Sequence, residues 1–148
     1  MPTLTSGTAA VYGREVITPA LARSLRDAGL RWRPHRGDHF IVDNRGMDDE
    51  VFVLSDMTVE LQHFPSGPVI GFNGTTEWAL DSLQQDDALW LPLEHQLRAR
   101  LDDAFVRLER SGRTYVVVVE VDGDDSIAHS EDPAEAYGLA LLEVLQSL

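Results

Sequence analysis

The chain has 148 residues, of which 43% are hydrophobic; it has no cysteine, and its net charge is −13. This length predicts one domain with its own core, and the lack of cysteine excludes disulfides, thiolate metal sites and cysteine nucleophiles. The negative charge disfavours nucleic acid and anionic membranes, and no apolar run reaches the roughly 18 residues of a membrane helix. With no signal-peptide pattern at its start, we expect a cytoplasmic protein without a cofactor.

Charge is distributed unevenly along the chain. Residues 1–46 carry seven arginines against four acidic residues, whereas the remainder carries five arginines against twenty-one acidic residues. All the basic residues are arginine. The arginine-rich first third can pair with the acidic remainder of its own fold or with an anionic partner, and we favour the first interpretation.

Residues 1–17 are rich in small and hydroxyl side chains and predict a loose arm or a marginal edge strand. A helix follows, because Thr18 is a good N-cap and Pro19 suits the first helical position. Gly29 predicts its end in a left-handed cap, in which Leu25 would contact Leu30.

Between residues 38 and 72 the pattern changes to that of β-structure. The segments "HFIVD", "VFVLSDMTVELQHF" and "PVIGF" predict strands, and "PSG" at 65–67 predicts a turn. Ser55 and Asp56 lie where the alternation changes, which indicates a bulge or a tight turn. Short links between these strands favour an antiparallel meander.

Three further helices and one strand are predicted in the second half. "TTEWALDSL" predicts a helix over 75–83, and "LPLEHQLRARLDDAFVRLER" predicts another over 91–110 with Pro92 at its first position. The apolar seam of this second helix comprises Leu97, Leu101, Phe105 and Leu108. "TYVVVVEV" at 114–121 predicts a strand buried on both faces.

The last helix is predicted to start at "DPAE". There Asp132 would cap, Pro133 would be the first helical residue and Glu135 would complete a capping box. Its predicted core stripe comprises Tyr137, Leu141, Val144, Leu145 and Leu148. Together the elements predict an α+β fold, an antiparallel meander of about four to six strands with about four helices packed on it, as one domain over 18–148.

The stretch "RPHRGDHF" at 33–40 is the first candidate site, because His35 and His39 flank Asp38 among arginines. A helix would bring the two imidazoles onto one face, but Pro34 and Gly37 disfavour a helix. On an extended chain they lie about 13 Å apart, too far to share a zinc ion unless a turn at Arg36–Gly37 folds the loop back. We therefore predict no metal site.

Asp56 is the second candidate. It lies between two apolar runs, where burial would raise the pKa of its carboxyl group. One hypothesis is a small hydrolase that uses Asp38, His39 and Asp56 as acid/base groups or metal ligands. The other is a turn aspartate bonded to its own backbone, and we favour it. "VDGDDS" at 121–126 has two acids at calcium-loop spacing, but its glycine is misplaced, so it predicts a hairpin turn.

Trp32 is the third candidate. Each tryptophan lies beside a proline or an element boundary and is expected to fill the core. A partly exposed Trp32 between Arg31 and Arg33 would instead form a binding hot spot. The predicted binding surface comprises Trp32, Arg33, His35, Arg36 and Asp56.

Four strings together, "LRDAGLRWRPHRGDHF", "VFVLSDMTVE", "FNGTTEWALDS" and "WLPLEHQLR", make the chain resemble a group of small actinobacterial proteins labelled pilus-assembly CpaE-like. The resemblance covers about residues 18–148 and implies a bacterial source. A meander followed by helices is also similar in architecture to the SUKH superfamily of immunity and interaction proteins.

Without a catalytic motif, the sequence favours a non-catalytic protein-interaction or regulatory module that binds a protein partner. The alternatives are the small hydrolase and an acidic mimic of nucleic acid, which would need carboxylates spaced along one face like phosphates.

Overall fold

A computed structural model describes residues 17–42, 47–54, 61–64, 67–70, 83–84 and 88–148. The chain divides into two compact units, one formed by Met1–Arg31 with Leu91–Leu148 and the other by Trp32–Trp90. Both contain antiparallel sheet, and the first also contains helices, so the predicted α+β class is confirmed. The predicted arm at 1–17 lies almost entirely outside the described residues.

Helix α2 (Pro19–Asp27) begins and ends as predicted. The Thr18 hydroxyl accepts a hydrogen bond from the Leu21 amide, and Pro19 occupies the first helical position. At the other end Gly29 adopts a φ of +114°, and the Leu30 amide donates to the Leu25 carbonyl at 2.9 Å. This is the Schellman arrangement, and Leu25 and Leu30 are both buried beside it.

Three strands of the first unit form an antiparallel meander in the order β7-β8-β9. Their bounds are β7 (Phe105–Ser111), β8 (Thr114–Val121) and β9 (Asp124–Ser130). Asp122 and Gly123 both have positive φ between β8 and β9, as a two-residue hairpin with the favoured twist requires. The predicted hairpin turn at "VDGDDS" is thus confirmed.

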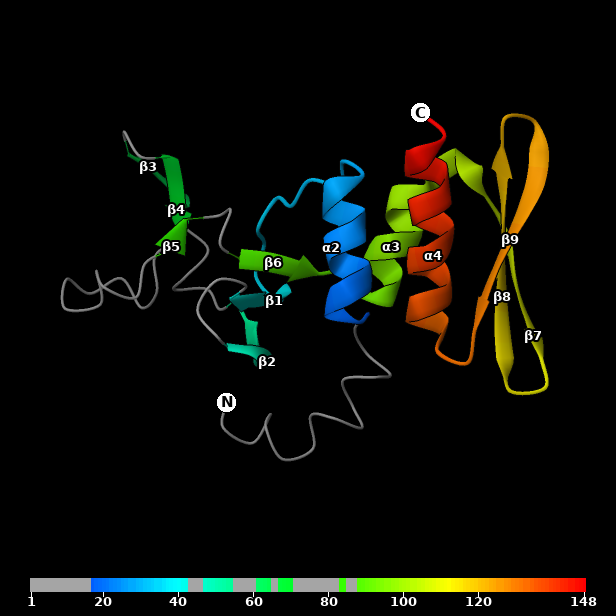
Figure 1. Cartoon of the computed structure of the whole chain (residues 1–148), viewed down its shortest axis with the longest axis horizontal. Coiled ribbons are helices and arrows are strands. Elements are labelled where there is room, and N and C mark those ends of the chain that lie inside the picture. Colours follow the sequence, from blue (N-terminus) through cyan, green and yellow to red (C-terminus); the bar gives the residue numbers. More distant parts are fainter. Residues whose placement is uncertain (1–16, 43–46, 55–60, 65–66, 71–82, 85–87) are drawn as a thin grey trace. The chain divides into compact units, whose positions relative to one another are not determined.

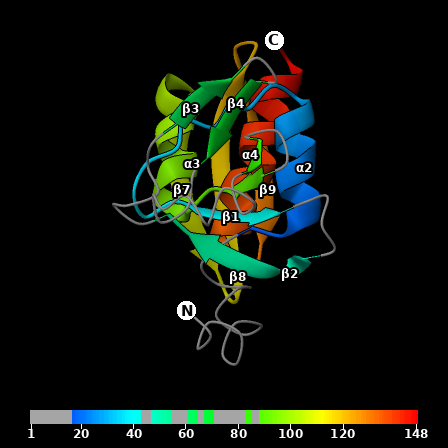
Figure 2. The ribbon, with the colours of Figure 1, turned by 90° about the vertical axis from the view of Figure 1, so that its left-hand side faces the viewer.

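Helix α4 (Pro133–Gln146) is the central element of this unit. One side packs on β8 and β9, and α2 and α3 (Glu94–Leu101) flank it away from the sheet (Figures 1 and 2). Gly138 permits the approach of α2, because a Cβ atom there would lie 2.6 Å from Leu21 Cδ2. The core of the unit is built from these contacts. It includes Ile17, Leu21, Leu25, Leu97, Leu101, Val117, Val119, Tyr137 and Leu141.

The predicted helix over 91–110 is wrong at both ends. α3 begins at Glu94, after N-cap Leu93, so Pro92 is not its first residue, and it ends at Leu101. A 3-10 turn, η4 (Asp102–Ala104), follows, and Phe105 then begins strand β7. Pairing with the strongly β-forming valines of β8 outweighs the helical spacing of Phe105 and Leu108.

The last helix is confirmed in position but differs in detail. Asp132 caps it by accepting from the Ala134 amide, yet the Asp132 amide donates to Ser130 Oγ and not to Glu135. The Glu135 carboxylate accepts from the amide and hydroxyl of Thr18, both at 3.1 Å. Leu148, predicted to be core, is 95% exposed because it lies beyond the last turn.

The second unit contains two three-stranded antiparallel sheets, with strand orders β2-β1-β6 and β3-β4-β5 among the described residues. The first comprises β1 (His39–Val42), β2 (Met47–Val53) and β6 (Ala88–Leu91); the second comprises β3 (Leu61–Phe64), β4 (Gly67–Ile70) and β5 (Leu83–Gln84). The predicted strands are confirmed in these segments, but β2 starts at Met47, four residues before the predicted strand that begins at Val51. Ser55 and Asp56 lie outside the described residues. So does the helix predicted over 75–83, apart from Leu83, which is in β5.

Candidate functional site

The stretch 32–38 forms a closed turn in front of β1. The Asp38 amide donates to the His35 carbonyl at 3.1 Å, and Gly37 between them has a φ of +92°. A positive φ at the third turn position is the mark of a type II turn, which needs glycine there. The Gly37 amide donates to the Leu54 carbonyl, and the Leu54 amide donates to the Asp38 carbonyl. The base of the turn is therefore joined to the end of β2.

A buried carboxylate closes the turn from inside. Asp38 is 3% exposed, and its Oδ2 accepts from the Trp32 indole nitrogen at 2.8 Å and from the His35 amide at 2.9 Å. Hydrogen bonds to a charged acceptor are among the stronger ones in proteins, which suits a carboxylate at this depth. Asp38 thus links the first residue of the turn to its middle.

Trp32 is itself held by aromatic packing. It is only 9% exposed, and its ring stacks on Trp90 with centroids 6.5 Å apart. Its contact with the Phe40 ring is tilted, with centroids 5.5 Å apart. Phe40 in turn contacts Phe52. The expectation that Trp32 fills the core is confirmed, and the alternative of a partly exposed hot spot is wrong, because the Asp38 bond draws the indole inward.

The two histidines bond to the backbone of the turn. The Nδ1–H of His35 donates to the Arg33 carbonyl at 2.8 Å, and the Nδ1–H of His39 donates to the Gly37 carbonyl at 3.2 Å. A carbonyl can only accept, so Nδ1 is the donor in both of these bonds. The chain does turn at Arg36–Gly37, but among the described residues no three His, Asp or Glu side chains gather as metal ligands.

What the turn offers to a partner is cationic. Arg33, His35 and Arg36 are all exposed, between the buried Trp32 and the buried Asp38. An arginine guanidinium presents a planar set of donors that matches a carboxylate in two-point contact. The structure thus brings together four of the five predicted binding residues, three on the surface and Trp32 beneath them; the fifth, Asp56, is outside the described residues.

Of the predicted acid/base set, Asp38 and His39 belong to the described part of the chain, whereas Asp56 does not. Asp38 is engaged in closing the turn, and His39 is half-buried at the start of β1. We name the unit formed by Trp32, Asp38 and residues 33–37 between them the cationic turn.

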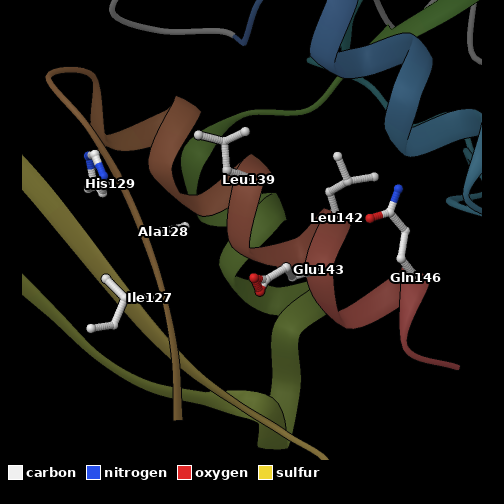
Figure 3. Close-up of a pocket in the computed structure, with 7 residues that line it drawn as sticks. All are labelled: Ile127, Ala128, His129, Leu139, Leu142, Glu143 and Gln146. Atoms are coloured by element: carbon white, nitrogen blue, oxygen red, sulfur yellow. The ribbon is translucent and has the colours of Figure 1, made fainter.

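A second feature lies within the first unit, where an open groove of about 420 Å³ runs between β9 and α4. Figure 3 shows three lining residues from β9 and four from α4, with the Glu143 side chain between helix and strand. The lining comprises Ile127, Ala128, His129, Leu139, Leu142, Glu143 and Gln146. The sequence prediction missed this groove.

Comparisons of the chain with protein-family models, with curated proteins and with solved structures gave no match. Within the described residues no helix is long and apolar enough to span a membrane.

Proposed function

We propose that the chain is a non-catalytic protein-interaction or regulatory module of a bacterial cytoplasm, and that the cationic turn binds an acidic segment of a protein partner. The observation that carries the proposal is that residues 32–38 divide into buried residues, which hold the turn together, and exposed residues, which a partner can contact. Trp32 and Asp38 are buried and bonded to each other, while Arg33, His35 and Arg36 are exposed between them.

Preorganisation is what makes such a turn suited to binding. Ordering a loop on association costs free energy, roughly 0.5–1.5 kcal/mol for each flexible side chain immobilised. Here the backbone is already held by the type II turn, by the Asp38 carboxylate and by Leu54. The partner therefore meets a turn whose backbone is already ordered.

Charge favours a protein partner over nucleic acid. The chain as a whole carries −13, so a long polyanion would meet repulsion over most of the surface. A short acidic segment can contact the local cationic turn without facing the remainder. Two-point pairing of Arg33 with a carboxylate is the contact we expect to contribute most to specificity.

The test compares affinity capture from the native host with the wild-type chain and with Arg33→Glu/Arg36→Glu. The matched control is Arg113→Glu, which reverses the charge of an exposed arginine in the β7–β8 hairpin. We expect a specific partner to be lost with the double variant and kept with the control. Fluorescence anisotropy with a labelled oligoglutamate peptide should show the same order. Equal capture and equal peptide binding by all three proteins would disprove the proposal.

A further inference from the structure

Strand β9 lies at an edge of the β7-β8-β9 sheet, with β8 as its single neighbour among the described strands (Figure 1). The outer backbone groups of such an edge can pair with another strand. Proteins commonly protect long edges with charge or proline. In β9 the acidic residues Asp124 and Asp125 are confined to one end, and the centre is Ser126, Ile127 and Ala128.

The most exposed large apolar side chain in this sheet is at the middle of that edge. Ile127 is 61% exposed, against 44% for Val106 and 39% for Leu108 on β7. Side chains alternate along a strand, so Asp125, Ile127 and His129 share one face. Ser126 points to the other face, where its hydroxyl donates to Glu143 of α4 at 2.8 Å.

We propose that two copies of the chain pair antiparallel along β9 about a two-fold axis at Ile127. The sequence of β9 is complementary to itself in this register. Asp125 lies opposite His129 of the partner subunit, and Asp125 of the partner subunit lies opposite His129. The two Ile127 side chains meet at the axis, where directly opposed residues have Cβ atoms about 4.5–5.5 Å apart.

Neighbouring registers do not have this complementarity. If the axis is moved to Ser126, the Asp125 carboxylate lies opposite the apolar Ile127 of the partner subunit. If the axis is moved to Ala128, the Asp125 carboxylate lies opposite Glu131 of the partner subunit. Like charges directly opposed across strands are destabilising. Ile127 is thus the axis position that combines apolar contact with two opposite-polarity pairs. The groove between β9 and α4 opens along this same edge, with Leu139 37% exposed on its helical side.

Net charge sets the conditions for pairing. Two chains of −13 repel each other, and the repulsion is screened over about 8 Å at physiological ionic strength. We therefore expect the dimer to tighten as salt is added to a dilute buffer. This interface lies in the first unit and does not depend on the cationic turn or on the proposed function.

Sedimentation equilibrium of the full chain tests the pairing. We expect a concentration-dependent dimer whose Kd weakens by at least about tenfold in Ile127→Lys, because two charges would meet at the axis. Val106→Lys is the matched control, since it introduces the same charge at an exposed apolar position of β7, and it should leave the Kd unchanged. A wild-type chain that stays monomeric, or a dimer that responds equally to both variants, would overturn the proposal.

A charge exchange tests the register independently of folding. Asp125→His and His129→Asp should each weaken the dimer, and the double variant should restore it because the pairs are re-formed in reverse. Ile127→Cys adds the only cysteine to the chain. Oxidation should link it covalently into a dimer, whereas Val106→Cys should stay unlinked. Failure of the exchange to restore association, or linkage of both cysteine variants alike, would rule out this register.

Discussion

The Trp32 indole nitrogen donates to the Asp38 carboxylate at 2.8 Å across a six-residue separation, and both residues are buried. The same oxygen accepts the His35 amide. A single side chain therefore determines the course of the whole turn, and its replacement should affect the turn and the aromatic cluster together.

Replacement of Asp38 by alanine should destabilise the fold by about 2–3 kcal/mol, because two buried donors lose a charged acceptor. Asp38→Asn should cost less, since one amide oxygen can still accept both bonds. Urea unfolding measures the free energies, and the exciton-coupled circular dichroism of the stacked Trp32–Trp90 pair reports on the cluster. Equal stability of the alanine variant and the wild type would contradict the structural role of Asp38.

Gly138 should resist substitution in a way that depends on Leu21. Gly138→Ala gains about 1 kcal/mol of helix propensity but introduces overpacking that typically costs about 1–3 kcal/mol. We expect net destabilisation in the wild type, because the added Cβ lies 2.6 Å from Leu21 Cδ2.

In the Leu21→Ala background the same Gly138→Ala substitution should be stabilising, because the clashing methyl group is gone. A double-mutant cycle by thermal or urea unfolding measures this coupling. Additive effects of the two substitutions would show that α2 and α4 do not approach closely at this point.

The helix cap Asp132 should show a pH-dependent effect on stability. Burial raises the pKa of Asp132 above its ordinary value of 3.8, and the bond from the Ala134 amide opposes this only in part. The folded state thus binds the proton more tightly than the unfolded state, so ionisation of Asp132 lowers stability as pH rises past 3.8.

Asp132→Asn keeps an equally good cap without the charge, whereas Asp132→Ala should cost about 1 kcal/mol. We expect the asparagine variant to gain stability relative to the wild type as the pH is raised from 3.8 to neutrality. Urea unfolding across that range provides the measurement. A relative loss over the same range would mean that the charge at the cap is favourable.

The bond from Thr18 to Glu135 should contribute to the stability of the first unit. Glu135→Ala removes the acceptor for the Thr18 amide and hydroxyl, and we expect a loss of about 1 kcal/mol. Glu135→Gln should lose about half of this, because one of its two terminal atoms can still accept. The control is Glu131→Ala, which replaces an exposed acidic residue two positions before the helix. It should change the unfolding free energy by less than about 0.5 kcal/mol.

The sequence was sufficient to predict those elements whose structure is determined by residues close to one another in the chain. Thr18, Pro19 and Gly29 define the ends of α2 through their own hydroxyl, ring and φ, and the structure contains each of these features. The turn at Asp122–Gly123 is of the same kind. Such elements depend on a few neighbouring residues, so they can be predicted from the sequence without knowledge of the tertiary contacts.

The predictions were wrong where the structure of a segment depends on contacts with another segment of the chain. Phe105 and Leu108 have helical spacing with Leu97 and Leu101, but pairing with β8 places them in a strand. Glu135 lies at the capping-box position but bonds to Thr18, 117 residues away. The bond between Trp32 and Asp38 was missed for a related reason, because the spacing of an indole and a carboxylate does not reveal whether a turn brings them together.

The first unit is built from two separated segments of the chain, Met1–Arg31 and Leu91–Leu148, with the second unit inserted between them. During synthesis α2 leaves the ribosome long before α4, the helix that covers its apolar side. Closing so long a loop is entropically costly while the intervening chain is unfolded, and compaction of Trp32–Trp90 shortens the effective loop. We therefore expect the inserted segment to become ordered first, and the nascent α2 to stay open to chaperones until translation is almost complete.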